Sequence, residues 1–404
     1  MSINYNEGKC SSVLDCKLTE DGRPKTEKSH LQSSHTKRIY GFHLFTSFFL
    51  KINLVILFAS FFLFPACNNQ KSTSETPKYW CWITYKADDN WEEICQKMQD
   101  AGIKGMLLSA PAEKYPEVIK IAKKYNIDIH AWQWVMNRGG KEILQNHPDW
   151  LSVNREGKSL AQDTAYVPYY KFLCPAIPEV RQYIKAEMEK ILQIEGLKGL
   201  SLDYIRYVDV ILPENIQPKY NIVQDKEYPE WDYGYHPAML KKFENLHHYN
   251  PLELEDPSTD EKWKQFRYDQ ITEIVNMLAD LTHQHDKIIS ASPFPSPAIA
   301  RKMVRQDWDK WNLDLVFPMI YSGFYADGGE DWIANCVKEG VESVQAKGTK
   351  VYCGLFSSHH KNDTLDLQKA MSVAMENGAS GIAIFSYRGL DSLQWEQLEA
   401  FTQK

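Results

Sequence analysis

Apolar and polar residues alternate with two different periods from Tyr79 to the C-terminus. Short runs repeat every second residue, as strands do, and longer stretches repeat every three to four residues, as helices do. The strand-like runs are eight in number, and most of them end in a polar or aromatic residue. They cover residues 79–85, 103–109, 127–134, 197–203, 287–292, 315–321, 350–356 and 381–387.

Helix-like stretches lie between these runs. They cover residues 91–100, 115–125, 178–195, 263–286, 297–311, 332–345, 365–377 and 393–402. Eight strand–helix units in about 325 residues predict an α/β fold of the (β/α)8 TIM-barrel type. A doubly wound open sheet is the alternative, but it normally has a Gly-rich phosphate-binding turn after an early strand. The segment 85–89, which follows the first predicted strand, contains no glycine.

The run 197–203 contains the first candidate for chemistry. Leu200 and Leu202 alternate with Ser201 and Asp203, so one face is apolar and the other is small and polar. Side chains at the C-terminal ends of barrel strands line the active site of such enzymes. We therefore expect Asp203 to be catalytic; the alternative is a structural Asp that pairs with Arg206 or caps a turn.

Two long segments interrupt the alternation, after the third and the fourth predicted strands. The first insertion covers residues 135–174 and the second insertion covers residues 208–260. A long loop within a compact domain is usually functional or disordered, and the many aromatic residues here argue against disorder. Both insertions follow a strand, where active-site loops of a barrel belong. We interpret them as walls of a substrate cleft.

Four motifs, in the same order, resemble those of a bacterial family of glycosyl-hydrolase-like proteins, numbered ten among such families. The family's L-D-Y-I-R-Y, N-P-x-x-P-E-V-R, D-W-x-x-W and P-Q-I-Y motifs correspond to 202–207, 174–181, 307–311 and 318–321 of this chain. Cys174, Met319 and Val208 depart from the family pattern. The resemblance extends from about Tyr79 to the C-terminus and implies a barrel that acts on glycans.

Glycoside hydrolysis requires two carboxyl groups across the scissile bond. Asp203 is one of them. The leading candidate for the second is Asp307, in the D-W-x-x-W-like motif, although a salt-bridged Asp at a helix end is the alternative. Weaker candidates are Asp163, Asp232, Asp327 and Glu330. The seventh predicted strand carries no carboxylate, unlike that of xylanase-type barrels, so Asp203 resembles the strand-four nucleophile of other barrels.

Aromatic residues make up 13% of the chain, which suits stacking on sugar rings but also suits a large core. Trp132 and Trp134 share one strand face, and their alternative role is packing inside the barrel. Arg206 would keep Asp203 ionised or bind a substrate oxygen. The candidate substrate-binding residues are Trp132, Trp134, Tyr204, Arg206, Tyr207, Trp231, Trp308, Tyr321 and Tyr387.

Several other functions find little support. The net charge of −7 argues against nucleic acid as a partner. The chain has neither a G-x-S-x-G elbow nor a P-loop. The neighbouring pairs His247-His248 and His359-His360 would point to opposite faces of a strand and would not share a metal. We therefore expect no metal and no cofactor.

The N-terminal part has the features of an exported lipoprotein. Residues 1–39 form a polar extension, which a misassigned start codon would explain. Residues 40–66 contain an apolar run after Lys51 and end in Ala66, as signal peptides do. Cys67 follows as in a bacterial lipobox, and 67–78 form a polar tether that leads to the barrel domain, 79–404. The alternative is a transmembrane anchor over 40–66, which Lys51 would interrupt.

Together these features predict a glycoside hydrolase attached by lipid to the bacterial cell envelope, at the outer membrane, its periplasmic face or the cell surface. Its partners would be a polysaccharide or oligosaccharide and the membrane, with no nucleic acid. The resemblance adds envelope glycan, including peptidoglycan strands, as a substrate. The alternative is a glycan-binding lipoprotein without catalytic activity.

The lipid anchor is testable at Cys67. In the Cys67→Ala variant no thiol remains to be acylated, so the protein should leave the membrane fraction. Fractionation of cells that express either form, followed by detection of the protein in each fraction, measures this. A variant that remains in the membrane fraction like the parent would show that another segment holds the protein there.

Overall fold

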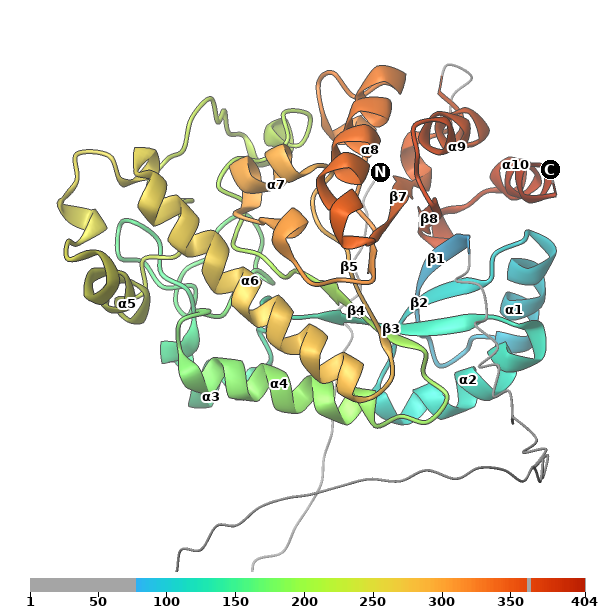
Figure 1. The fold of residues 1–404 in the computed structure, drawn as a ribbon, viewed down its shortest axis with the longest axis horizontal. Helices are drawn as coiled ribbons and strands as arrows, with labels where there is room; N and C mark the ends of the chain where they lie inside the picture. The colour runs from blue at the N-terminus through green and yellow to red at the C-terminus, as the bar shows by residue number, and fades with distance from the viewer. Residues whose placement is uncertain (1–77, 362–364, 404) are drawn as a thin grey trace, which may run out of the picture. The chain divides into compact units, whose positions relative to one another are not determined.

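The structure is a computed structural model that describes residues 78–361 and 365–403, and it confirms the predicted (β/α)8 barrel. All eight strands are parallel, and β1 pairs with both β2 and β8, which closes the barrel (Figure 1). The strands are β1 (Tyr79–Thr84), β2 (Gly105–Ser109), β3 (Asp128–Trp134), β4 (Gly199–Asp203), β5 (Ile288–Ala291), β6 (Leu315–Val316), β7 (Lys350–Phe356) and β8 (Gly381–Phe385).

Helices surround the strands in Figure 1. They are α1 (Trp91–Asp100), α2 (Tyr115–Ala122), α3 (Lys141–Asn146), α4 (Pro178–Leu192), α5 (Pro237–His247), α6 (Glu261–Gln284), α7 (Pro297–Val304), α8 (Glu330–Val344), α9 (Leu367–Glu376) and α10 (Ser392–Thr402). The helices α3 and α5 lie in the first and second insertions, and the sequence pattern did not predict them. The predicted segments 1–39 and 40–66, and the tether up to residue 77, lie outside the described residues.

The apolar face predicted for β4 lies in the larger of two apolar clusters. Leu200 and Leu202 belong to the large core between strands and helices. A separate cluster fills the barrel interior, and Trp80 and Phe317 pack there with ring centroids 5.3 Å apart. Gly105 leaves room for the Trp80 ring, since a Cβ on this glycine would lie 2.1 Å from that ring. The barrel interior is therefore filled mainly with aromatic side chains.

The strand predicted over 315–321 is shorter in the structure. Pro318 has no N–H with which to continue the ladder. Beyond it the backbone turns, as Ile320 N donates to Pro318 O and Tyr321 N donates to Met319 O. Tyr321 consequently lies beyond β6 rather than within it.

The helix predicted over 297–311 ends at Val304. Arg305 follows with φ 58°, the left-handed conformation common after a helix C-terminus. This turn brings Gln306 back toward the end of β4. Its side chain accepts a hydrogen bond from Phe294 N at 2.9 Å and donates one to Ile205 O at 3.2 Å. The early end of α7 therefore fixes the turn that follows Asp203.

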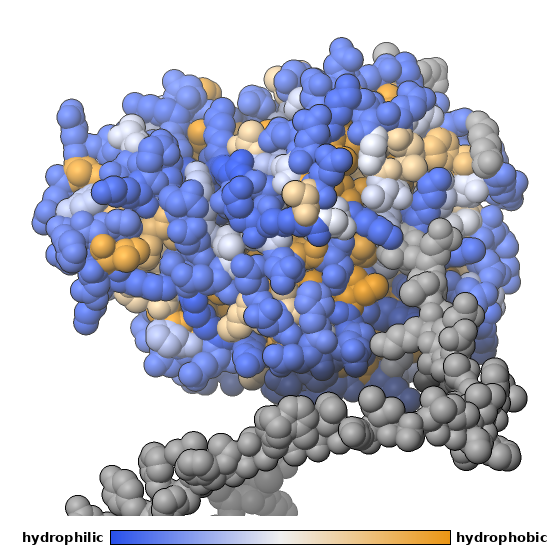
Figure 2. Space-filling view, viewed as in Figure 1, coloured by the Kyte–Doolittle hydropathy of each residue, from blue (hydrophilic) through white to orange (hydrophobic). Residues whose placement is uncertain are grey.

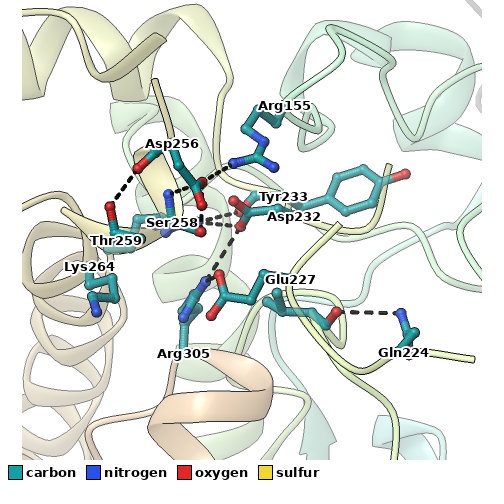
Figure 3. Close-up of polar contacts among 12 residues, drawn as sticks. Arg155, Gln224, Glu227, Asp232, Tyr233, Asp256, Ser258, Thr259, Lys264 and Arg305 are labelled. Atoms are coloured by element: carbon teal, nitrogen blue, oxygen red, sulfur yellow. Dashed lines mark hydrogen bonds and ion pairs between the residues drawn. The ribbon is translucent and has the colours of Figure 1, made fainter. Parts of the chain in front are cut away.

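A buried charge network attaches the second insertion to the helices (Figure 3). Asp232 accepts a hydrogen bond from Arg267 of α6 at 2.5 Å and lies 3.7 Å from Arg305, which also pairs with Glu227. Asp232, Arg267 and Arg305 are at most 1% exposed. Burial opposes the ionisation of Asp232, but the two arginines outweigh it and lower its pKa. Asp232 is thus placed as a structural anchor.

The two insertions also contact each other. Asn154 of the first insertion donates from Nδ2 to Glu230 O at 2.9 Å, and it forms an isolated antiparallel bridge with Tyr233. Arg155 pairs with Asp256 at 2.7 Å, which Figure 3 also shows. The two loops predicted to line a cleft therefore form one continuous structure.

The face of the molecule seen in Figure 2 is largely hydrophilic, with apolar residues in small groups among polar ones. Within residues 78–361 and 365–403, no helix combines the length and the apolar composition that crossing a membrane requires.

The network around Asp232 leads to a stability prediction. In Asp232→Asn, the charges of Arg267 and Arg305 lose their shared buried partner, so the free energy of unfolding should fall by about 3–5 kcal/mol. Urea unfolding followed by tryptophan fluorescence measures the change. The control Glu187→Gln removes one partner of an exposed pair with Lys190 and should cost less than about 1 kcal/mol. Equal losses in the two variants would contradict the role given to Asp232.

Candidate active site

The carboxyl group of Asp203 lies at the C-terminal end of β4 and is 7% exposed. The indole Nε1 of Trp132 donates to its Oδ2 at 2.8 Å, and the backbone N–H of Tyr204 donates to its Oδ1 at 2.6 Å. Burial raises the pKa of Asp203, and these two hydrogen bonds and the nearby charge of Arg206 offset this only in part. The group therefore retains its proton to a higher pH than an ordinary Asp, as a general acid must.

The residue after Asp203 has an unusual backbone. Tyr204 has φ 47°, a left-handed conformation that is uncommon for a residue with a large side chain. Its carbonyl accepts from Met136 N, and its ring packs on Trp134 with centroids 4.5 Å apart. Strain of this kind is concentrated at functional sites, where the surrounding structure supports it. The turn directs the Tyr204 N–H at the Asp203 carboxyl.

Arg206 does not form the predicted pair with Asp203. Its guanidinium donates instead to Asp209 at 3.0 Å, to Tyr207 O at 2.8 Å and to the Tyr170 hydroxyl at 3.2 Å. Four aromatic rings surround this guanidinium at 5.1–5.7 Å, those of Tyr170, Phe172, Tyr204 and Phe294. Arg206 bonds to Asp209 and not to Asp203 because the chain turns after Asp203 and carries the Arg206 side chain toward the second insertion.

Asp209 is the functional candidate that the sequence did not single out. It is 3% exposed, pairs with Arg206, and its carbonyl accepts from the Tyr166 hydroxyl at 2.9 Å. The spacing of three residues between Arg206 and Asp209 could have indicated an ion pair. The signal was weak, because such i, i+3 pairs are expected on helices and this segment is a turn. Asp203 and Asp209 thus stand at the two ends of one buried turn that contains Arg206.

The Trp132 ring, which is bonded to Asp203, belongs to a group of aromatic rings near the ends of the strands. Phe385, the last residue of β8, contacts Trp132 at 6.2 Å, Tyr321 at 5.8 Å and Trp82 at 6.0 Å between centroids. Trp132 and Tyr321, both predicted to bind substrate, are therefore linked through Phe385, which sequence reasoning missed. We call Trp132, Tyr321 and Phe385 the aromatic cluster.

Two other predicted tryptophans lie on the insertions. Trp134 contacts Tyr169 of the first insertion at 6.1 Å as well as Tyr204. Trp231 of the second insertion stacks on Tyr166 at 5.7 Å, with their planes inclined by 11°. Trp134 contacts Tyr204 directly, whereas Trp231 is linked to Tyr204 through the rings of Tyr166 and Tyr170.

The structure places Asp307 away from these contacts. Its carboxyl pairs with Arg301 of α7, which also pairs with Asp309. Burial raises the pKa of Asp307, and the ion pair with Arg301 opposes this. Among the described residues, no hydrogen bond or ion pair joins Asp307 to Asp203. Asp307 is therefore held in an ion pair with Arg301, and its position opposite Asp203 stays a prediction.

Three predicted substrate-binding residues also pack elsewhere. Trp308 is 1% exposed and its ring lies against Gly340 of α8. Tyr387 packs on Trp395 of α10, with centroids 5.2 Å apart. The Tyr207 hydroxyl donates to Arg267 O at 3.2 Å within the core. All three strengthen the helical layer rather than line the strand ends.

Three of the four weaker carboxylate candidates, all but Asp327, have hydrogen-bond or ion-pair partners within the described residues. Asp232 belongs to the buried network, and Glu330 pairs with Lys369. The Asp163 carboxylate accepts from Thr164 N at 2.9 Å. In the part of the chain that the structure describes, no group of three His, Cys, Asp or Glu residues is arranged to hold a metal.

The comparisons with known proteins agree with this fold. The family model described as glycosyl hydrolase-like 10 matches residues 112–364. No curated protein matches the chain.

Solved structures that resemble the chain include three β-galactosidases. The enzyme from Bacillus circulans sp. alkalophilus is 14% identical, with a TM-score of 0.54, over 81% of this chain and 56% of that one. The enzyme from the psychrophilic Marinomonas ef1 is 12% identical, with a TM-score of 0.52, over 81% of this chain and 59% of that one. The enzyme from Halorubrum lacusprofundi is 10% identical, with a TM-score of 0.53, over 81% of this chain and 57% of that one. The chain spans less than two thirds of each, and likeness at such identity shows the fold alone.

The raised pKa of Asp203 predicts a pH dependence of stability. The pKa of Asp203 in the folded protein exceeds its unfolded value of about 3.9. The contribution of Asp203 to the free energy of unfolding is therefore fully present below about pH 3.9, and it is lost as pH rises through the folded pKa. Asp203→Asn lacks this titration, so its stability relative to the parent should increase with pH. Urea unfolding of both proteins between pH 4 and pH 8 measures the difference.

A matched control is Ser201→Ala, on the same strand face and without an ionisable group, whose effect should be equal at every pH. A difference between the Asp203→Asn variant and the parent that stays constant across the range would show that the Asp203 pKa is not raised.

Proposed function

Because this chain belongs to the glycosyl hydrolase-like 10 family, we propose that it is a glycoside hydrolase that cleaves a polysaccharide or oligosaccharide at Asp203. The observation that carries the proposal is the buried Asp203 carboxyl at the end of β4, with two N–H donors and a raised pKa. The aromatic cluster beside it supplies flat apolar surfaces that suit the faces of sugar rings.

Asp203 acts as the general acid in this proposal, rather than as the nucleophile that the sequence suggested. A carboxyl whose pKa is raised by burial keeps its proton to a higher pH and can protonate the glycosidic oxygen as the bond to the anomeric carbon breaks. The N–H groups of Trp132 and Tyr204 point at its two oxygens, so they stabilise the carboxylate left after proton transfer.

Asp209 replaces Asp307 as the proposed second carboxyl. It lies in the same turn as Asp203, and the Arg206 guanidinium holds its carboxylate by a hydrogen-bonded ion pair. In an inverting reaction it would take a proton from the attacking water, and in a retaining one it would attack the anomeric carbon. Separations of roughly 6.5–9.5 Å and 5–5.5 Å between the carboxyl groups distinguish these mechanisms. Arg206 then positions Asp209 and does not bind substrate itself.

We also propose that the protein is attached by lipid at Cys67 to the bacterial cell envelope. The apolar run before Ala66 and the Cys that follows support this. Envelope glycan, including peptidoglycan strands, is the proposed substrate class because of the family. The activity named for the galactosidases is that of those proteins.

The second candidate function is glycan binding without catalysis. The observation that favours it is the burial of Asp209, which is 3% exposed and is already paired with Arg206. A binding protein would use the aromatic cluster in the same way and would need no second carboxyl.

Turnover decides between the two candidates. Asp203→Asn should lower glycan hydrolysis by about 100-fold or more, the usual contribution of a general acid, while glycan binding is retained. Asp209→Asn should also lose turnover. Release of reducing ends from purified peptidoglycan strands, chitin, xylan and galactan by the parent and both variants measures this.

Asp307→Asn is the matched control, because its carboxyl pairs with Arg301 beside the outer helices. Its activity per folded molecule should remain close to that of the parent. Parental hydrolysis by Asp203→Asn would refute the role of Asp203, and binding without hydrolysis by the parent would establish the second candidate.

A further inference from the structure

A cavity of about 240 Å³ lies next to the Trp134 ring, between the end of β3 and the first insertion. Its lining includes Trp134, Leu144, Pro168 and Tyr169, together with Asn137. Ligand sites of this kind combine apolar walls with a few placed polar groups. The volume is below the range of about 300–1,000 Å³ typical for drug-sized ligands, so it suits a single sugar ring.

Asn137 supplies the polar group. It is 3% exposed, and its Oδ1 accepts a hydrogen bond from Lys171 N at 2.9 Å. This bond fixes the amide, so that Nδ2 is left as a donor, and Nδ2 has no partner within the described part of the chain. A buried donor without an acceptor costs about 1–3 kcal/mol. A ligand oxygen in the cavity would remove that cost.

Tyr169 supplies the apolar surface. It is 45% exposed, which is unusual for a ring of this size, and it lies 6.1 Å from Trp134 with the planes tilted by 37°. The Lys171 ammonium is held by Leu160 O and Asp163 O, so its alkyl stem lines the cavity. The residues that line the cavity are thus mostly apolar, and Asn137 is the amide among them.

The cavity shares Trp134 with the surroundings of Asp203. Trp134 is the register partner of Asp203 in the β3–β4 pairing, and Val135 N donates to Asp203 O at 2.9 Å. The Trp134 ring also packs on Tyr204, whose N–H is bonded to the Asp203 carboxyl. A glycan with one bond at Asp203 could therefore extend over Trp134 into the cavity.

We propose that this cavity is a subsite for a second pyranose residue of the glycan that binds at Asp203. The ring lies on Tyr169 and Trp134, and one of its oxygens accepts the hydrogen bond from Asn137 Nδ2. The proposal rests on the proposed function, because it assigns a further sugar position to the same glycan. It makes affinity depend on the length of the glycan.

The test measures binding of oligosaccharides of different length. The probes are β-linked oligomers of glucose, xylose and N-acetylglucosamine, two to six residues long, with affinity measured by calorimetry on the full-length protein. Tyr169→Ala removes the exposed ring, and Asn137→Asp keeps Oδ1 but removes the donor. Both variants should bind the longest oligomer about tenfold more weakly than the parent, the effect of losing one contact worth about 1.4 kcal/mol, and should bind disaccharides as the parent does.

Leu252→Ala is the control, since Leu252 is 44% exposed and lies in the second insertion, outside the cavity lining. It should bind every oligomer like the parent. Thermal unfolding shows whether Asn137→Asp is folded, and Tyr169→Ala changes an exposed side chain and tests the proposal independently.

The outcomes separate this inference from the proposed function. Length-dependent binding that both variants weaken, without cleavage of any oligomer, supports the subsite and refutes the hydrolase. Cleavage of long oligomers at parental rates by both variants supports the hydrolase and overturns the subsite. Equal affinities for all lengths, or no binding of any oligomer, also overturn the subsite.

Discussion

The removal of one carboxyl group from water, that of Asp203, is the constraint on which the candidate site depends. A buried carboxylate is unfavourable unless donors compensate it, and here the donors are neutral N–H groups from Trp132 and Tyr204. Neutral donors compensate less than a bonded guanidinium would, so burial dominates and the pKa is raised. The direction of Arg206, toward Asp209, is therefore as important for the chemistry as Asp203 itself.

Neighbouring elements hold this arrangement in place. The early end of α7 lets Gln306 bond both Phe294 and Ile205, which fixes the turn behind Asp203. The buried Asp232 network holds the second insertion, and contacts at Asn154 connect it to the first. Such fully buried charges add little stability of their own but are costly to disrupt. The network accordingly determines where the insertions lie more than how stable the barrel is.

Much of the fold could be predicted from the sequence, because two-residue and three-to-four-residue periods report which face of each element is buried. The same alternation placed Asp203 at a strand end. The partners of Arg206 could not be predicted in this way, since they depend on a turn in which Tyr204 adopts a left-handed conformation. The end of α7 was mispredicted for a similar reason: helical spacing continued past Val304, but Arg305 ended the helix.

The two carboxyl groups of the turn differ in the charge that faces them. Asp203 meets uncharged N–H donors, whereas Asp209 meets the guanidinium of Arg206 within a ring of aromatic side chains. The proposed roles follow this difference: Asp203, whose pKa burial raises, donates the proton, and Asp209 is the carboxylate that Arg206 holds. A guanidinium bonded to the residue at the end of β4 would instead lower the pKa of that residue. The proposed acid therefore depends on Arg206 turning toward Asp209 and not toward Asp203.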